Sequence, residues 1–264
     1  MNSIADSIQT WRGTKALLTG EVLCSMLGVS KLEGADLSKV NLQGAILPGA
    51  NLQGANLRGA TLRGAFLVDA NLEGADLQYA DAQDAFLSGA TLRGANLQAA
   101  YFAGAHMASA DLGNANLRAA NLYGADLHLA SLRDADLRTC TLQRAVLSGA
   151  LLKGAKMFAT DLQGTDLAGV DLTDGVDLTA GALLYGAQHR SILPLNAGDL
   201  GFGALYPQAD GWYVSFWGEH RTLENFEKWI NSSYMMDKAG ISLLHALYAA
   251  CLAFVEATPE PSEG

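Results

Sequence analysis

The sequence predicts an all-β solenoid, in which short extended segments wind into stacked coils around a leucine-rich core. Every fifth residue from Leu32 to Leu172 is apolar, and 25 of these 29 residues are leucine. The residue two places earlier is alanine in 23 of 29 cases, and the residue between them is asparagine or aspartate in 16. We call the apolar fifth residues central, and the residues just before and just after each one leading and following.

A period of five fits neither an α-helix nor a flat strand. A helix turns every 3.6 residues, so these leucines would spiral around it without forming a lasting apolar face. A flat strand alternates by two, so successive central residues would point to opposite faces. Within one unit, however, the small and the central side chain can both point inward, and the last two residues can form a corner. One coil cannot bury its leucines alone, so coils must stack.

The repeated units resemble those of a known family. Runs such as Ala50-Asn51-Leu52-Gln53-Gly54 are similar to the A-(D/N)-L-x-x unit of the pentapeptide repeat family, over about 145 residues. This resemblance implies a right-handed, four-sided β-helix with four units per coil. At a strand spacing of ~4.8 Å, roughly seven coils would make a rod of roughly 34 Å. Ala82 and Phe102 would then be vertical neighbours, the small residue making room for the large one.

Residues 1–30 are expected to cap the N-terminal end of the rod. Residues 4–11 have the pattern of a short amphipathic helix, which a lead-in to the first coil follows. A cap is expected because the open end of a stacked coil exposes backbone groups that invite pairing with other chains. Val22 and Leu27 keep the five-residue register, so weak coil units are also expected in the lead-in.

The rod itself is expected to span residues 31–185. After Leu172 one extra residue appears, and Leu178 continues the period in a shifted frame. Composition then changes, and residues 186–256 are expected to form a small α+β cap or dimerisation region. Residues 257–264 are polar and rich in proline and glutamate, so we expect them to be disordered.

Two elements are expected early in this C-terminal region. Asp210 and Gly211 predict a turn, from which the aromatic run 212–217 leaves as a strand. Thr222 is a good N-cap for a helix over 222–230, which has acidic residues near its start.

A strongly apolar helix is expected over residues 239–255. Four of its residues fall on one stripe that would serve a cap or a dimer interface: Ile241, Leu244, Tyr248 and Val255. The stretch is short of the about 20 residues that cross a bilayer, so a membrane-spanning role is not expected.

One side of the predicted rod has an unusual surface. In the coils centred on residues 47, 67, 87 and 107, the leading residues of this side are apolar or aromatic: Ile46, Phe66, Phe86 and His106. The other three sides mostly carry polar residues at this position. Pro48 and Val68 are apolar following residues on the same side. A continuous apolar strip of this kind is seldom left in water. Three interpretations remain open: cover by the chain's own N- or C-terminal segment, a homodimer interface, or a site for a different protein.

Charge argues against direct nucleic-acid binding. The net charge of −10 would oppose encounter with phosphates. Some pentapeptide repeat proteins bind DNA gyrase as acidic rods that resemble DNA, so a topoisomerase-binding DNA mimic is the alternative function. Residues 31–173 hold 14 acidic and 11 basic side chains, however, and the basic ones interrupt any sustained negative face. No secretory signal is visible at the start, so the cytoplasm is the expected compartment.

No catalytic or metal-binding constellation can be named. The three cysteines are scattered, and the five histidines show no metal-ligand spacing. Glu219 and His220 are interpreted as part of a polar turn, and Cys140 as an inert core thiol. We therefore expect a non-enzyme without cofactors or metals, which acts as a protein-interaction or structural module with an unidentified protein partner.

Overall fold

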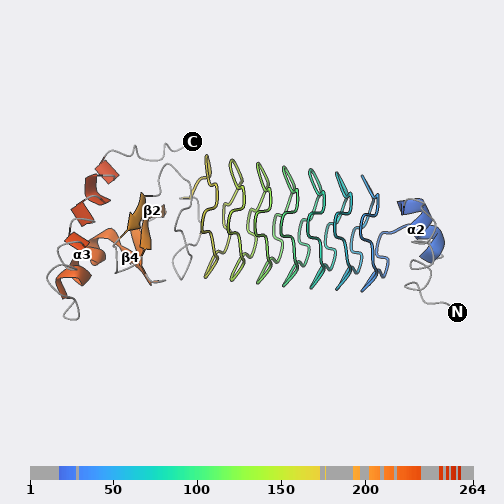
Figure 1. Cartoon of the computed structure of the whole chain (residues 1–264), viewed down its shortest axis with the longest axis horizontal. Coiled ribbons are helices and arrows are strands. Elements are labelled where there is room, and N and C mark those ends of the chain that lie inside the picture. Colours follow the sequence, from blue (N-terminus) through green and yellow to red (C-terminus); the bar gives the residue numbers. More distant parts are fainter. Residues whose placement is uncertain are drawn as a thin grey trace.

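The computed structural model describes a long rod with a helix at its N-terminal end and a small sheet at its C-terminal end (Figure 1). The described residues are 18–27, 30–172, 176, 193–196, 202–208, 211–216, 219–232, 244–245, 248–249, 251–253 and 255–256. Their helices and strands are α2 (Gly20–Leu27), β1 (Leu193–Asn196), β2 (Phe202–Gln208), β3 (Gly211–Phe216), β4 (Glu219–Thr222) and α3 (Leu223–Ser232).

Parallel bridges between residues twenty apart build the rod. They run without interruption from Asp36↔Asn56 to Val146↔Asp166, so each coil contains four five-residue units. From Leu37 to Leu147 the central N–H donates to the leading carbonyl of the next coil, as Leu57 does to Asp76 at 2.7 Å. The N–H of the leading residue donates to the carbonyl of the small inward residue in the previous coil, as Asn56 does to Ala35 at 2.9 Å. The sequence-based expectation of a four-sided coil is confirmed.

The inward side chains form one continuous core. From Leu37 to Leu172 every central residue is at most 2% exposed. Thr160 and Thr165 replace inward alanines, and their hydroxyls donate to the carbonyls of Leu137 and Leu142 at 2.8 Å. These polar groups are therefore satisfied inside the core. Each corner residue has a positive φ, for example 63° at Gly54, which explains the frequent glycine.

The N-terminal end differs from the expected weak coil units. Val22 and Leu27 belong to helix α2, so the expectation that they extend the coil is wrong. Thr19 begins the helix instead: its hydroxyl accepts the Val22 N–H at 3.4 Å, and Glu21 follows in the first turn. Thr19 also pairs in parallel with Ile46, so the ladder gains a partner before the helix closes its end. The expected helix over 4–11 lies outside the described residues.

A four-stranded antiparallel sheet, in the order β1-β2-β3-β4, closes the C-terminal end. Its two faces serve different cores because side chains alternate along a strand. Ala204 and Tyr206 on one face are buried with the core of the rod. Leu205 and Val214 on the other face are buried with Phe226 of helix α3. The sheet therefore joins the rod to the helical layer beyond it (Figure 1).

The structure has a strand and a helix where the C-terminal sequence pattern places them. The expected aromatic strand corresponds to β3, and the expected helix corresponds to α3. The hydroxyl of Thr222 accepts the N–H of Asn225 at 3.2 Å, as an N-cap does. The expected disordered tail, residues 257–264, lies outside the described residues.

The fully buried vertical neighbours Ala82 and Phe102 provide a test of core packing. Phe102→Ala should lower the free energy of unfolding by about 3–5 kcal/mol through a cavity. Ala82→Leu should lower it by about 1–3 kcal/mol through overpacking. The double variant Ala82→Leu/Phe102→Leu should recover most of the loss, because it restores the central leucines of the other coils. Urea denaturation of these variants and the wild type measures this, and a double variant no more stable than Ala82→Leu alone would contradict vertical compensation.

Candidate protein-binding face

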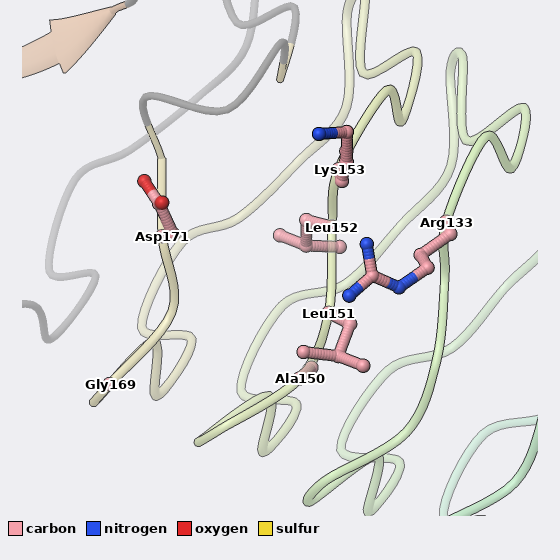
Figure 2. A pocket seen from close by; sticks show the side chains of 7 residues that line it. All are labelled: Arg133, Ala150, Leu151, Leu152, Lys153, Gly169 and Asp171. Carbon is pink, nitrogen blue, oxygen red and sulfur yellow. The ribbon is translucent and has the colours of Figure 1, made fainter. Parts of the chain in front are cut away.

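A small pocket lies on the side of the rod near its C-terminal end (Figure 2). It has a volume of about 190 Å³, and Arg133, Leu151, Lys153 and Asp171 contribute side chains to its lining. Pockets that hold drug-sized ligands are usually about 300–1,000 Å³. The pocket therefore does not favour a small-molecule site.

The described residues also do not favour a metal site, a membrane-spanning helix or a catalytic cluster at Glu219 and His220. Among the residues that the structure describes, no three His, Cys, Asp or Glu side chains gather to hold a metal ion. None of the described helices has the length and apolarity needed to cross a membrane. Glu219 and His220 belong to strand β4, where they pair with Phe216 and Ser215. The polar turn expected there is thus a strand in the structure.

The C-terminal apolar stripe lies against the chain's own core. Leu244 is buried, and Tyr248 and Val255 are partly buried against the cluster that includes Phe226. Ile241, the fourth predicted residue of the stripe, lies outside the described residues. For these three residues, the surface that the sequence assigned to a cap or a dimer interface is packed against the chain's own core.

Six predicted surface residues lie together on one side of the rod. We call this side, centred on residues 47, 67, 87, 107, 127, 147 and 167, the aromatic face. Within it, the aromatic strip consists of the leading residues Ile46, Phe66, Phe86 and His106, which bridge one another in that order. The Phe66 and Phe86 rings stack with their centroids 4.7 Å apart, as do those of Phe86 and His106. Pro48 and Val68 lie in the adjacent following row.

The strip is open to solvent in the described structure. Phe66 is 43% exposed, His106 and Pro48 are exposed, and Phe86 and Val68 are half-buried. The corners on either side of it are mainly glycine, so few side chains stand beside the rings. The side is therefore a flat, accessible apolar surface, which is the usual mark of an interaction site.

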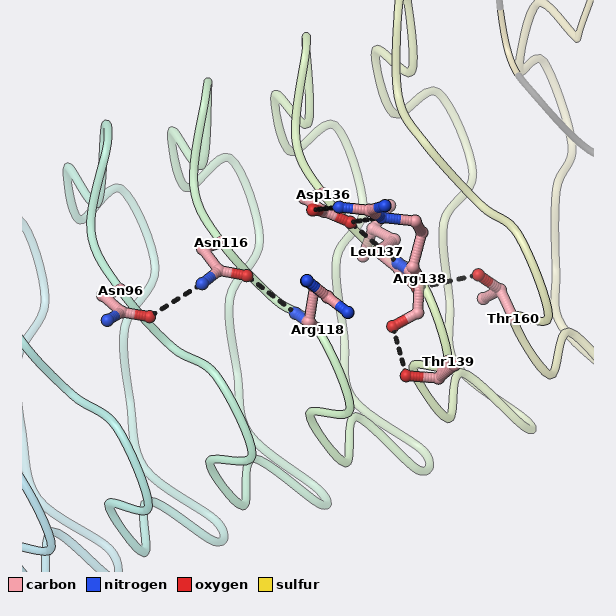
Figure 3. Close-up of polar contacts among 8 residues, drawn as sticks. All are labelled: Asn96, Asn116, Arg118, Asp136, Leu137, Arg138, Thr139 and Thr160. Atoms are coloured by element: carbon pink, nitrogen blue, oxygen red, sulfur yellow. Dashed lines mark hydrogen bonds and ion pairs between the residues drawn. The ribbon is translucent and has the colours of Figure 1, made fainter.

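On the other sides, most leading asparagines and aspartates stabilise the backbone (Figure 3). Asn116 Oδ1 accepts the N–H of the following residue Arg118 at 3.2 Å, and its amide donates to Asn96 in the previous coil at 3.0 Å. The same two-residue bond recurs at other leading Asn and Asp residues, including Asn56 with Arg58. Asparagine and aspartate are frequent at this position because they satisfy an N–H that the ladder leaves unpaired.

The aromatic strip lacks this bond. Ile46, Phe66 and Phe86 have no side-chain acceptor. The following residue in the unit of Ile46 is Pro48, which has no N–H to satisfy. Within the described part of the chain, the N–H groups of Val68 and Ser88 have no hydrogen-bond partner. The bond returns only at Asp126, which accepts the N–H of His128 at 3.0 Å. Local departures from a stabilising rule are typical of functional surfaces.

A second group of exposed aromatic residues is not apparent from the repeat pattern. Tyr79, Tyr101 and Tyr123 are 40–51% exposed and lie on different positions of neighbouring coils. The Arg58 guanidinium lies 4.9 Å from the Tyr79 ring, and that of Arg144 lies 5.9 Å from the Tyr123 ring. The sequence feature that could have revealed these residues is tyrosine at outward positions that polar residues otherwise occupy.

Arginines neutralise several outward carboxylates. Arg63 pairs with Asp81 at 2.6 Å, and Arg93 pairs with Asp111 at 3.2 Å. Arg138 holds Asp136 at 2.5 Å (Figure 3). The hydrogen bond from this guanidinium keeps the pKa of the Asp136 carboxyl below its ordinary value. These sides therefore do not present an uninterrupted row of negative charge.

A family model matches the residues of the rod. The family model described as "Pentapeptide repeats" matches eight copies, over residues 30–64, 55–94, 67–107, 95–134 and 135–174. A trypsin-treated form of QnrB1, a plasmid-mediated fluoroquinolone resistance protein, is 25% identical over 60% of this chain and 84% of its own, with a TM-score of 0.47. HetL from the cyanobacterium Nostoc sp. strain PCC 7120, a protein involved in heterocyst differentiation regulation, is 27% identical over 72% and 96%, with a TM-score of 0.33. No curated protein matches the chain.

The three thiols provide a test of how tightly the rod core is packed. Burial raises the pKa of Cys140, and it raises the pKa of Cys251 to about 12, whereas Cys24 is partly exposed. We expect only Cys24 to react rapidly with a thiol reagent in the folded protein, because the other two are buried and protonated at neutral pH. Mass spectrometry after brief labelling measures this. Rapid modification of Cys140 would contradict an intact rod core.

The strip provides a second test, because asparagine is a common leading residue elsewhere. Phe66→Asn/Phe86→Asn should leave the free energy of unfolding within about 1.5 kcal/mol of the wild type. The lost ring stacking, about 0.5–1.5 kcal/mol per pair, is offset by new bonds to the Val68 and Ser88 N–H groups. Urea denaturation at low protein concentration, where association does not contribute, measures this. A loss of several kcal/mol would mean that the rings hold the rod together.

Proposed function

Because the chain belongs to the pentapeptide repeat family of right-handed β-helical proteins, we propose that it is a non-catalytic protein-binding rod and that the aromatic strip is its binding surface. The observation that supports this most directly is the replacement of a backbone-stabilising residue by exposed rings in successive coils. Phe66 and Phe86 cannot accept the N–H that asparagine accepts elsewhere. Their rings contribute apolar surface that becomes useful only when another surface covers it.

A protein is the class of partner that this surface fits. The strip is apolar at its centre, its corners are mainly glycine, and the polar residues Thr19 and Asp126 lie beyond its two ends, so another protein surface can reach its rings. Phenylalanine is among the residues that are enriched at protein interfaces relative to the rest of the surface. The described part of the chain offers no metal cluster, and its small pocket does not favour a ligand site.

Affinity capture with tagged protein tests this proposal. The wild type should retain one or more proteins, among them untagged copies of the chain if it self-associates, and Phe66→Asn/Phe86→Asn should lose them. The matched control Tyr101→Asn/Tyr123→Asn removes two exposed rings from another side and should retain the same proteins. Identical capture by the strip variant and the wild type would overturn the assignment of the binding surface.

The alternative function, binding of DNA gyrase as a DNA mimic, has weaker support. A mimic of phosphates needs a sustained negative face, whereas Asp81, Asp111 and Asp136 are paired with arginines. We therefore expect purified gyrase to supercoil DNA at an unchanged rate when the protein is added at about micromolar concentration, a level at which binding of ordinary strength would be visible. Inhibition of supercoiling would favour the mimic instead.

A further inference from the structure

The two outward rows of the aromatic face complement each other in size and charge, and we propose that its partner is a second copy of this chain, with the two rods parallel and face to face. This inference rests on the proposed function, because it names the partner of the same surface. It follows from pairing each leading residue with the following residue of its own coil: Ile46 with Pro48, Phe66 with Val68, Phe86 with Ser88, His106 with Ala108, Asp126 with His128, and Val146 with Ser148.

Symmetry makes these pairs the contacts of a dimer. A two-fold axis between the faces and parallel to the rods keeps each coil at its own height but exchanges the two rows. The leading row of one copy then faces the following row of the other. Each contact occurs twice, as in isologous interfaces generally. Both rods have the same spacing between coils, so the match continues along the face.

Size complementarity is the first argument. Where the leading residue is bulky the following one is smaller, as with Phe86 and Ser88 or His106 and Ala108. At the coil of Asp126 the order reverses, because the leading Asp126 is smaller than the following His128. A large side chain of one copy would therefore meet a smaller one of the other along the face, which close packing requires.

Charge complementarity is the second argument. In the parallel arrangement Asp126 of each copy meets His128 of the other. The His128 ring is held by a hydrogen bond between Nδ1 and Ser148 Oγ at 3.1 Å, and Nε2 is its other ring nitrogen. Asp126 uses Oδ1 for the His128 N–H of its own chain, which leaves Oδ2 for the partner. Two such polar contacts would fix the register beside the apolar centre of the interface.

An antiparallel dimer uses the same face less well. A two-fold axis across the rods, placed midway between Phe66 and Phe86, stacks these rings on each other but sets Ile46 against His106. It also moves Asp126 away from any histidine, opposite Thr19. The parallel arrangement instead matches six successive coils, and for this reason we favour it.

Solution mass is the first test. The purified full-length chain should have twice its 27.7 kDa mass by light scattering at about micromolar concentration. Phe66→Asn/Phe86→Asn should be a folded monomer, and the control Tyr101→Asn/Tyr123→Asn should remain a dimer. A monomeric wild type, as expected if a terminal segment of the chain or a different protein covers the strip, would overturn the proposal. So would a strip variant that stays dimeric.

A charge swap tests the arrangement with the rings intact. His128→Asp places two carboxylates against each other at each contact and should weaken dimerisation roughly tenfold or more. Adding Asp126→Lys should restore much of the affinity, because a lysine ammonium of each copy then meets an aspartate carboxylate of the other. Sedimentation velocity over a dilution series measures both. If the double variant dimerises no better than His128→Asp alone, the parallel register is wrong.

The outcomes separate this inference from the proposed function. If the wild type is monomeric but captures another protein through the strip, the second copy is excluded and the binding surface stands. If the wild type is monomeric and the strip variant captures the same proteins as the wild type, both proposals fail. A dimer that Phe66→Asn/Phe86→Asn dissociates supports both.

Discussion

Backbone hydrogen bonds between successive coils are the constraint on which the rest of the structure depends. The central N–H always reaches forward to the next coil and the leading N–H reaches back, as Leu87 and His106 show at 2.7 and 2.9 Å. This pattern requires four units per coil and a small inward residue before each central one. Packing therefore favours leucine and alanine at the inward positions, and the small central residue Ala82 lies beside the large Phe102.

The same constraint leaves the outward residues free to carry function. Among them, leading asparagines and aspartates have a local structural role, because their side chains accept the N–H of the following residue. On the aromatic face this hydrogen bond is absent at Ile46, Phe66 and Phe86. Instead, the rings of Phe66, Phe86 and His106 stack along the ladder on the surface of the rod, with neighbouring centroids 4.7 Å apart. The departure is local, and it lies on a rigid scaffold that positions the rings for binding.

Sequence patterns predicted the rod, β3 and α3, but not helix α2 or the burial of both faces of the sheet. Period-five leucines specify four-sided coils, and simple counting by twenty places Phe66 beside Phe86. At the N-terminal end Val22 keeps the same register but is helical, because Thr19 and Glu21 favour a helix start and no preceding coil fixes the strand. The two-faced burial of the sheet through Leu205 and Tyr206 depends on tertiary packing, which local patterns do not reveal. Exposed Tyr79 was missed because a single aromatic substitution breaks no periodicity.

Small-angle X-ray scattering of the purified chain tests the central claim, that the aromatic face joins rods side by side. Compared with Phe66→Asn/Phe86→Asn, the wild type should have a larger cross-sectional radius of gyration and nearly the same maximum dimension. End-to-end association through the C-terminal region would instead nearly double the maximum dimension and leave the cross-section unchanged. That result, or a wild-type curve identical to that of the strip variant, would contradict the account.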